Sequence, residues 1–84
     1  MASDRKTFDR VIGGKGTIPF RDLERLLRKL GFALARTSGS HRIYIHPKVL
    51  RPFSVQPIGK DAKRYQIRQL CDIIEEFGLT LEGG

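Results

Sequence analysis

Residues 20–47 read FRDLERLLRKLGFALARTSGSHRIYIHP, and the spacing of the apolar residues changes within this stretch. Four leucines recur at the i, i+3, i+4 and i+7 positions of one helix face: Leu23, Leu26, Leu27 and Leu30. Gly31 follows as a left-handed helix stop. After it the period is two, with a turn at Ser38-Gly39-Ser40 and a second strand over residues 41–46. The stretch therefore predicts a helix followed by a β-hairpin.

The sequence beyond this hairpin predicts a third strand and a second helix. Residues 47–51 are expected to form a connection, and Pro52 introduces a short strand over residues 53–56. The last helix is expected from Asp61, a favourable N-cap residue, to Phe77. Its buried stripe consists of Ile67, Leu70, Cys71, Ile74 and Phe77. A three-stranded antiparallel meander with both helices on one face buries both apolar stripes, which predicts an α+β fold of αβββα order.

Length and composition indicate one domain. A chain of 84 residues buries a single core, and 39% apolar residues suffice for it. We expect an N-terminal extension over residues 1–17, with a short helix and a Gly-rich linker, a main domain over 18–80 and a flexible tail over 81–84. The segment GGKGT at 13–17 lacks the G-x-x-x-x-G-K-[ST] spacing of a phosphate loop, so nucleotide binding is not expected.

Two features bear on the cellular compartment. No apolar stretch has the length of a membrane span, and no apolar run follows the charged residues at the start of the chain as it would in a signal peptide. Cys71 is the only cysteine, so the internal disulfide expected of a small secreted domain is excluded. We therefore expect a cytoplasmic protein that does not bind a membrane.

The net charge of +7 is unevenly distributed along the chain. All 16 Lys and Arg residues lie in residues 1–68 with five of the nine acidic residues, a net of +11, while residues 69–84 carry the other four acidic residues and no base. Basic side chains that neutralise phosphates release counterions, so such a distribution favours a polyanionic partner. The alternative is a basic protein made soluble by its charge.

The expected last helix carries its charges in the order that opposes the helix macrodipole. The basic residues at its start are Lys60, Lys63, Arg64 and Arg68. The acidic residues near its end are Asp72, Glu75 and Glu76. Each charge within a terminal turn costs about 0.3 to 1 kcal/mol in this order. Phosphate binding at the helix start would explain the arrangement, and a merely solvated basic turn is the alternative.

The strongest candidate for chemistry is His41, the first residue of the expected second strand, which the Gly39-Ser40 turn delivers. Imidazole exchanges a proton readily near neutral pH, and Arg42 beside it is placed to hold a phosphate. Strand alternation puts His41 with Ile43 and Ile45 on the expected core side, and Tyr44 on the other side. A half-buried structural histidine is therefore the alternative interpretation.

The remaining histidine and the cysteine do not complete a site. His46 lies five residues from His41, about 16 Å along a strand at roughly 3.3 Å per residue, and on the opposite side of the sheet. We expect His46 to be an exposed strand-end residue. A zinc site needs three or four convergent ligands, and Cys71 lies on an apolar helix stripe. No metal and no cofactor are expected.

Two motifs occur in order: L-x-x-x-G-F at residues 27–32 and G-S-H-x-x-Y at residues 39–44. With them, residues 20–79 resemble the HicA toxins. The chain is similar in particular to a subgroup with an N-terminal extension, a third strand ending in Gln, here Gln56, and a K-x-Y-Q-[VI]-R-Q helix start, here residues 63–69. Many HicA proteins also have a proline-x-histidine element after the third strand, and this chain has QPIG instead.

The resemblance implies an mRNA interferase with a double-stranded-RNA-binding-domain-like fold, one catalytic histidine and a HicB-type antitoxin as partner. By this analogy His41 is the catalytic residue. One titratable group at a Gly-Ser turn, in a basic chain without a set of metal ligands, leads us to the hypothesis that His41 acts as general base on a ribose 2′-hydroxyl without a metal. The residues expected to hold the RNA are Gly39, Ser40, Arg42, Lys60, Lys63, Arg64 and Arg68. Two alternatives remain: a non-catalytic RNA-binding domain of the same fold, in which His41 is structural, and a protein-interaction module that uses the basic helix.

Overall fold

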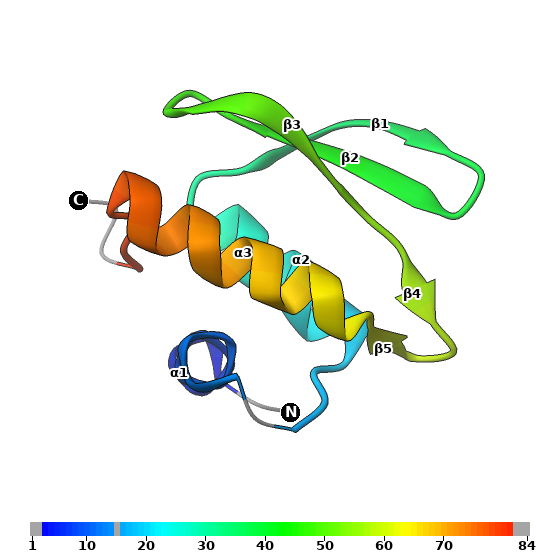
Figure 1. Ribbon diagram of the computed structural model, residues 1–84. Helices are drawn as coiled ribbons and strands as arrows, with labels where there is room; N and C mark the ends of the chain where they lie inside the picture. The colour runs from blue at the N-terminus through cyan, green and yellow to red at the C-terminus, as the bar shows by residue number, and fades with distance from the viewer. Residues whose placement is uncertain (1–2, 15, 82–84) are drawn as a thin grey trace.

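The computed structural model describes residues 3–14 and 16–81 (Figure 1). Its elements are α1 (Asp4–Gly13), α2 (Phe20–Lys29), β1 (Ala33–Ser38), β2 (His41–His46), β3 (Val49–Val55), β4 (Pro57–Ile58), β5 (Asp61–Ala62) and α3 (Arg64–Phe77). Strands β1, β2 and β3 form an antiparallel meander in that order. Helices α2 and α3 lie together on one side of the meander, and α1 lies beyond them (Figure 1). The predicted α+β class and αβββα order are confirmed.

The core lies between the meander and the helices, and both predicted apolar stripes contribute to it. The buried side chains of α2 and its end include Leu23, Leu26, Leu27 and Leu30. Those of α3 include Ile67, Leu70 and Ile74, while Cys71 and Phe77 are partly buried against them. The helical periodicity of the sequence therefore identified both buried faces.

The side of β2 that faces the helices is the opposite of the predicted one. Tyr44 is fully buried, whereas Ile45 is 48% exposed. Alternate residues of a strand share a side, so Arg42 and His46 lie on the helix side with Tyr44. The prediction that His41, Ile43 and Ile45 face the core is wrong.

Tyr44 can be buried because its hydroxyl has a partner. The hydroxyl donates a hydrogen bond of 2.7 Å to a carboxylate oxygen of Glu24 on α2. A buried tyrosine needs such a partner, and its ring then buries a large apolar area. The prediction relied on the aliphatic residues Ile43 and Ile45 within the strand. It could not include Glu24, the partner of Tyr44, which lies 20 residues away on α2.

His46 is not the exposed strand-end residue that was predicted. It is half-buried, its Nε2 lies 2.9 Å from the Leu30 carbonyl oxygen, and its Nδ1 accepts a hydrogen bond of 3.0 Å from the Lys48 backbone N–H. Because Nδ1 accepts, Nε2 carries the proton and donates it to Leu30. The ring also packs edge-on against Phe32, with 4.9 Å between the ring centroids. His46 thus ties the end of β2 to the end of α2.

Strand β3 begins earlier than predicted. The expected connection over residues 47–51 is reduced to a turn at Pro47-Lys48, and pairing starts at residue 49. The register with β2 is irregular after Tyr44 pairs with Phe53, and Pro52 lies in the irregular segment. Because β3 is an edge strand, a proline in this bulge is tolerated there.

Helix α3 begins later than predicted, and Asp61 is not its N-cap. Asp61 and Ala62 instead form β5, which pairs with β4 across a turn. The Phe20 N–H at the start of α2 donates a hydrogen bond of 2.8 Å to the Lys60 carbonyl oxygen. This long-range pairing holds residues 57–62 in a hairpin, and Lys63 becomes the N-cap residue of α3.

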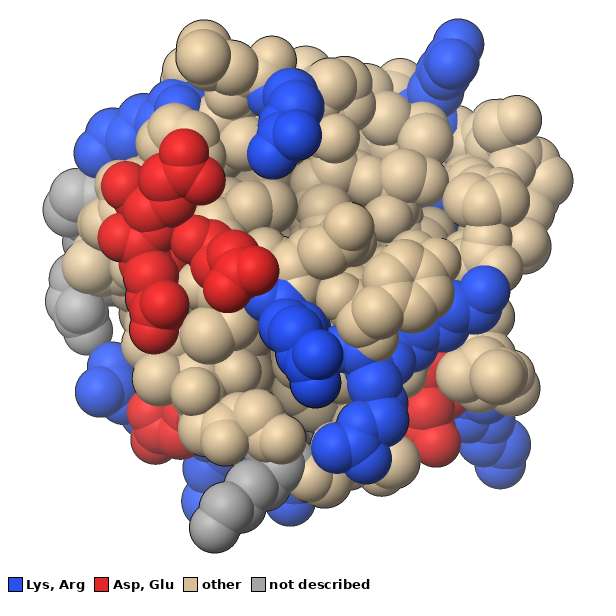
Figure 2. Space-filling model, in the orientation of Figure 1, with Lys and Arg blue, Asp and Glu red and all other residues tan. Residues whose placement is uncertain are grey.

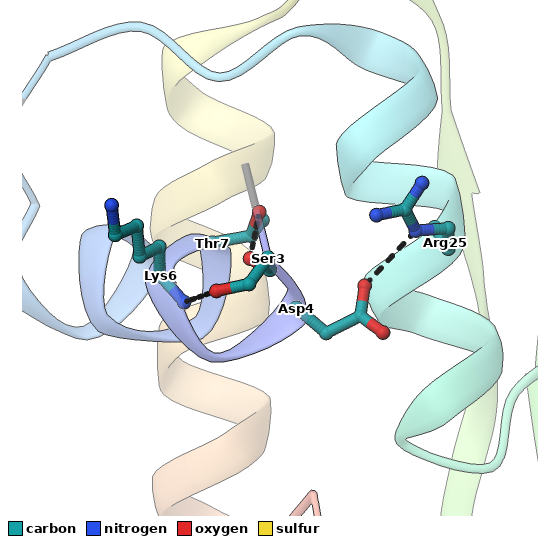
Figure 3. Close-up of polar contacts among 5 residues, drawn as sticks. All are labelled: Ser3, Asp4, Lys6, Thr7 and Arg25. Atoms are coloured by element: carbon teal, nitrogen blue, oxygen red, sulfur yellow. Dashed lines mark hydrogen bonds and ion pairs between the residues drawn. The ribbon is translucent and has the colours of Figure 1, made fainter. Parts of the chain in front are cut away.

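The short helix expected in the N-terminal extension is α1, and it packs against the domain. Val11 is buried in the core, and the side chain of Ser3 caps the helix by accepting from the Lys6 N–H at 3.2 Å. Asp4 forms an ion pair of 3.1 Å with Arg25 of α2 (Figure 3). Lys15 of the expected linker and residues 82–84 of the expected tail lie outside the described residues, and Leu81 is partly buried against the core.

Candidate active site around His41

The β1–β2 turn places His41. Ser38 pairs with His41, which leaves Gly39 and Ser40 as the two turn residues. Gly39 has a φ of +60°, a left-handed conformation that glycine adopts without strain. All three residues from Gly39 to His41 are exposed. The β1–β2 hairpin therefore presents the His41 imidazole at the surface, as a reacting group requires.

His41 lines a groove between β3 and α3, an open hollow of about 670 Å³. The β3 wall comprises Val49, Leu50, Arg51, Pro52, Phe53 and Ser54. The α3 wall comprises Tyr65, Gln66, Gln69, Asp72, Ile73, Glu76 and Phe77. An imidazole at a groove of this size has room for part of a nucleotide beside it.

Gln66 connects the two walls at the His41 end. Its amide oxygen accepts from the Gln56 backbone N–H at 3.1 Å, and its amide nitrogen donates to the Ser54 carbonyl oxygen at 3.2 Å. The side chain is buried, so neither bond competes with water. Because Arg42 pairs with Val55, the start of β2 lies beside this end of β3. The contact thus brings the first turn of α3 to the end of the groove where His41 lies.

Arg42 does not share a site with His41. Its guanidinium Nη1 forms a salt bridge of 3.0 Å with the Glu24 carboxylate on α2, and the guanidinium lies over the Phe20 ring. The same carboxylate accepts the Tyr44 hydroxyl. Burial and this hydrogen bond raise the pKa of the Tyr44 phenol, and the nearby Arg28 acts in the opposite direction. Arg42 therefore belongs to a polar cluster that joins β2 to α2, and the predicted placement of Arg42 beside His41 as a phosphate ligand is not found.

The basic residues predicted at the start of the last helix lie around the N-terminal end of α3, but none of them lines the groove of His41, and Arg64 and Arg68 line a separate hollow against α1. Lys63 is the N-cap residue of α3, no side chain caps the helix, and Arg64 and Arg68 are exposed on its first turns. Lys60 is exposed in the turn between β4 and β5. Figure 2 shows Lys and Arg side chains over the N-terminal half of α3 and a group of acidic side chains over its C-terminal half. The surface has the charge division that the sequence predicted.

Some groove residues were not predicted as site residues. Tyr65 and Gln69 lie on the groove wall formed by α3, and Arg51 lies on the wall formed by β3. The sequence feature that could have indicated Tyr65 is an aromatic residue among basic ones, since Tyr65 directly follows Arg64. Its relation to His41 depends on the packing of α3 along β3, which the sequence does not reveal.

The described residues contain no group of three or more His, Cys, Asp or Glu side chains placed to hold a metal ion. Over residues 3–14 and 16–81, no helix combines the length and the apolar character needed to cross a membrane. Burial raises the pKa of the Cys71 thiol, and the nearby carboxylates of Glu75 and Asp72 raise it further. Cys71 is thus a poor nucleophile and a packing residue.

The fold and the groove together define a small basic α+β domain with the αβββα order of double-stranded-RNA-binding domains and an exposed histidine at the groove between β3 and α3. The model of one protein family, described as the HicA toxin of bacterial toxin-antitoxin, matches residues 20–79. The chain belongs to the HicA toxin family. It is therefore an RNase-type toxin whose class has an antitoxin partner. No curated protein and no solved structure matched the chain.

Proposed function

We propose that this protein is a metal-independent endoribonuclease that cleaves mRNA with His41 as its general base, and that a HicB-type antitoxin inhibits it. The observation that carries the proposal is the position of His41. It is an exposed imidazole at the end of the groove near the basic start of α3, in a chain that belongs to a family of RNase-type toxins.

In the proposed reaction the Nε2 or Nδ1 atom of His41 takes the proton of a ribose 2′-hydroxyl. The 2′-oxygen then bonds to the adjacent phosphorus, and the bond from phosphorus to the 5′-oxygen breaks. The leaving oxygen takes a proton from water, so the products are a 2′,3′-cyclic phosphate and a 5′-hydroxyl. Because the nucleophile belongs to the substrate, no metal-activated water is required.

The basic residues near the start of α3 supply the electrostatic part of the proposal. Lys60, Lys63, Arg64 and Arg68 hold the phosphates on either side of the cleaved bond, and Gly39 and Ser40 form the turn against which the RNA lies. Positive charge near the phosphate stabilises the negative charge that develops on its oxygens. Arg42 is not included because Glu24 neutralises it.

The first test compares wild type with His41→Ala on a single-stranded RNA in EDTA. We expect wild type to cleave, His41→Ala to lose at least about 100-fold in rate, and both to bind the RNA equally. A 2′-deoxynucleotide at the cleavage position should block the reaction. If neither protein cleaves and both bind, the protein is a passive RNA-binding domain; cleavage that EDTA abolishes and magnesium restores would contradict the mechanism.

A second test addresses the phosphate contacts. Replacing Lys63 by Ala should weaken RNA binding and reduce the slope of log Kd against log salt by roughly 0.7 to 1, since one phosphate contact is lost. The matched control is Lys48→Ala, which removes an exposed lysine from the turn between β2 and β3. Equal effects of the two replacements would show that only net charge matters and that α3 is not the phosphate site.

A further inference from the structure

The two ends of the groove beside His41 are lined by different residues. Strand β3 and α3 run in opposite directions, since Ser54 near the end of β3 is bonded to Gln66 near the start of α3. His41 and Tyr65 therefore lie at the same end of the groove, while Val49 and Phe77 lie at the other.

The charges on the groove limit what can enter it. Its far half is lined by the carboxylates of Asp72 and Glu76 on α3, which repel phosphate, and by one cation, Arg51 on β3. At its near end the Lys63 ammonium lies by the Tyr65 ring, while Arg64 lines a separate hollow against α1. With two carboxylates against one guanidinium, the far half of the groove favours an uncharged group over a phosphate.

The near end has an aromatic surface suited to a base. Tyr65 is 57% exposed, although an aromatic ring of this size is usually more buried. The Lys63 ammonium lies 5.9 Å from the centroid of the Tyr65 ring. A nucleobase stacks on an exposed ring through its π-face whatever its sequence. Gln69, exposed one turn further along the same wall, presents an amide that both donates and accepts hydrogen bonds.

We propose that the groove holds one unpaired RNA base, stacked on the Tyr65 ring beside His41, with the Gln69 amide hydrogen-bonded to the edge of the base. This inference rests on the proposed function because it requires RNA as the ligand. A base within a duplex is stacked on its neighbours and is not available to Tyr65. The site therefore selects single-stranded RNA or an unpaired nucleotide, in contrast to the duplex recognition for which this fold is known in other proteins.

The test uses the full chain with His41→Ala, which prevents cleavage, and a short single-stranded RNA containing 2-aminopurine, whose fluorescence falls when it stacks. Adding Tyr65→Ala should weaken binding roughly 5- to 150-fold and abolish the fluorescence decrease, while Tyr65→Phe should keep affinity within about three-fold. A duplex of the same sequence should bind more weakly than the single strand. Ile58→Ala is the matched control, because Ile58 is exposed on β4 and does not line the groove.

Unchanged affinity and fluorescence after Tyr65→Ala would overturn the proposal, as would a duplex that binds as tightly as the single strand. Cleavage by the wild type is measured separately. A wild type that does not cleave, combined with loss of stacking in Tyr65→Ala, refutes the catalytic role of His41 and supports the base site. Cleavage that persists in Tyr65→Ala with unchanged KM refutes the base site and leaves the catalytic role intact.

Discussion

The imidazole of His46 occupies the space beside Gly31 in which a side chain would stand. A β-carbon on Gly31 would lie 2.8 Å from His46 Nε2, the atom that donates to the Leu30 carbonyl oxygen. Gly31 also has a φ of +104°, which L-residues rarely adopt. The glycine that ends α2 is therefore required twice, for its backbone conformation and for the approach of β2.

Gly31→Ala is expected to lower the free energy of unfolding by about 2 to 4 kcal/mol, from backbone strain together with displacement of His46. Gly59→Ala is the matched control. Gly59 also has a positive φ, of +61°, but a β-carbon added to it would meet no other group within 4 Å. This control should lose only about 1 kcal/mol. Urea unfolding measures both, and equal losses would show that the His46 contact contributes nothing.

Arg42→Ala should reduce stability and spare cleavage. Its partner Glu24 is only 14% exposed and would lose one of its two bonded neighbours, at a cost of about 1 kcal/mol. His41→Ala, one residue earlier, should show the reverse pattern of intact stability and lost cleavage. Cleavage rates are compared at a temperature where both variants are folded. A large loss of cleavage in folded Arg42→Ala would place Arg42 in the RNA site after all.

The Tyr44 phenol should make stability depend on alkaline pH. Its pKa in the folded protein is raised above the ordinary value of 10.0, mainly by burial and then by the bond to Glu24. The neutral phenol is thus favoured by folding, so its stabilising effect is full below about pH 10 and is lost as the pH rises further. Above about pH 10, wild type should lose stability more steeply with rising pH than Tyr44→Phe. If the free energy of unfolding falls equally with pH in the two proteins, the pKa of Tyr44 is the same in the folded and unfolded states.

The contribution of α1 to the stability of the domain can be measured by replacing two neighbouring residues. Val11 is 1% exposed and Ile12 is 41% exposed on the same helix. Val11→Ala should cost roughly 2 kcal/mol, because it removes buried methyl groups and leaves a cavity, and Ile12→Ala should cost well under about 1 kcal/mol. Thermal unfolding is the measurement. Equal shifts in Tm would indicate that α1 is not part of the cooperative unit.

Local patterns in the sequence were sufficient for much of the fold. The helix over residues 20–30 follows from the leucine spacing and Gly31, and β2 has the predicted bounds because a Gly-Ser turn precedes it and Pro47 follows it. The predicted start of α3 at Asp61 was wrong because a hydrogen bond from Phe20 to Lys60 holds this segment in a hairpin. The preference of aspartate for the N-cap position is a local effect. The hydrogen bond between Phe20 and Lys60, which are far apart in the sequence, outweighed it.

For the site, the sequence by itself determined which residue types are available: a histidine directly after a Gly-Ser turn, and a last helix whose basic half precedes its acidic half. Only the tertiary structure decided what stands next to what. The burial of Tyr44 against Glu24 turns the Arg42 side of β2 toward α2, where Arg42 pairs with Glu24, and the hydrogen bonds of Gln66 bring Tyr65 to the His41 end of the groove. Periodicity reports the conformation of one segment, whereas the side of a strand that is buried depends on partners from other segments.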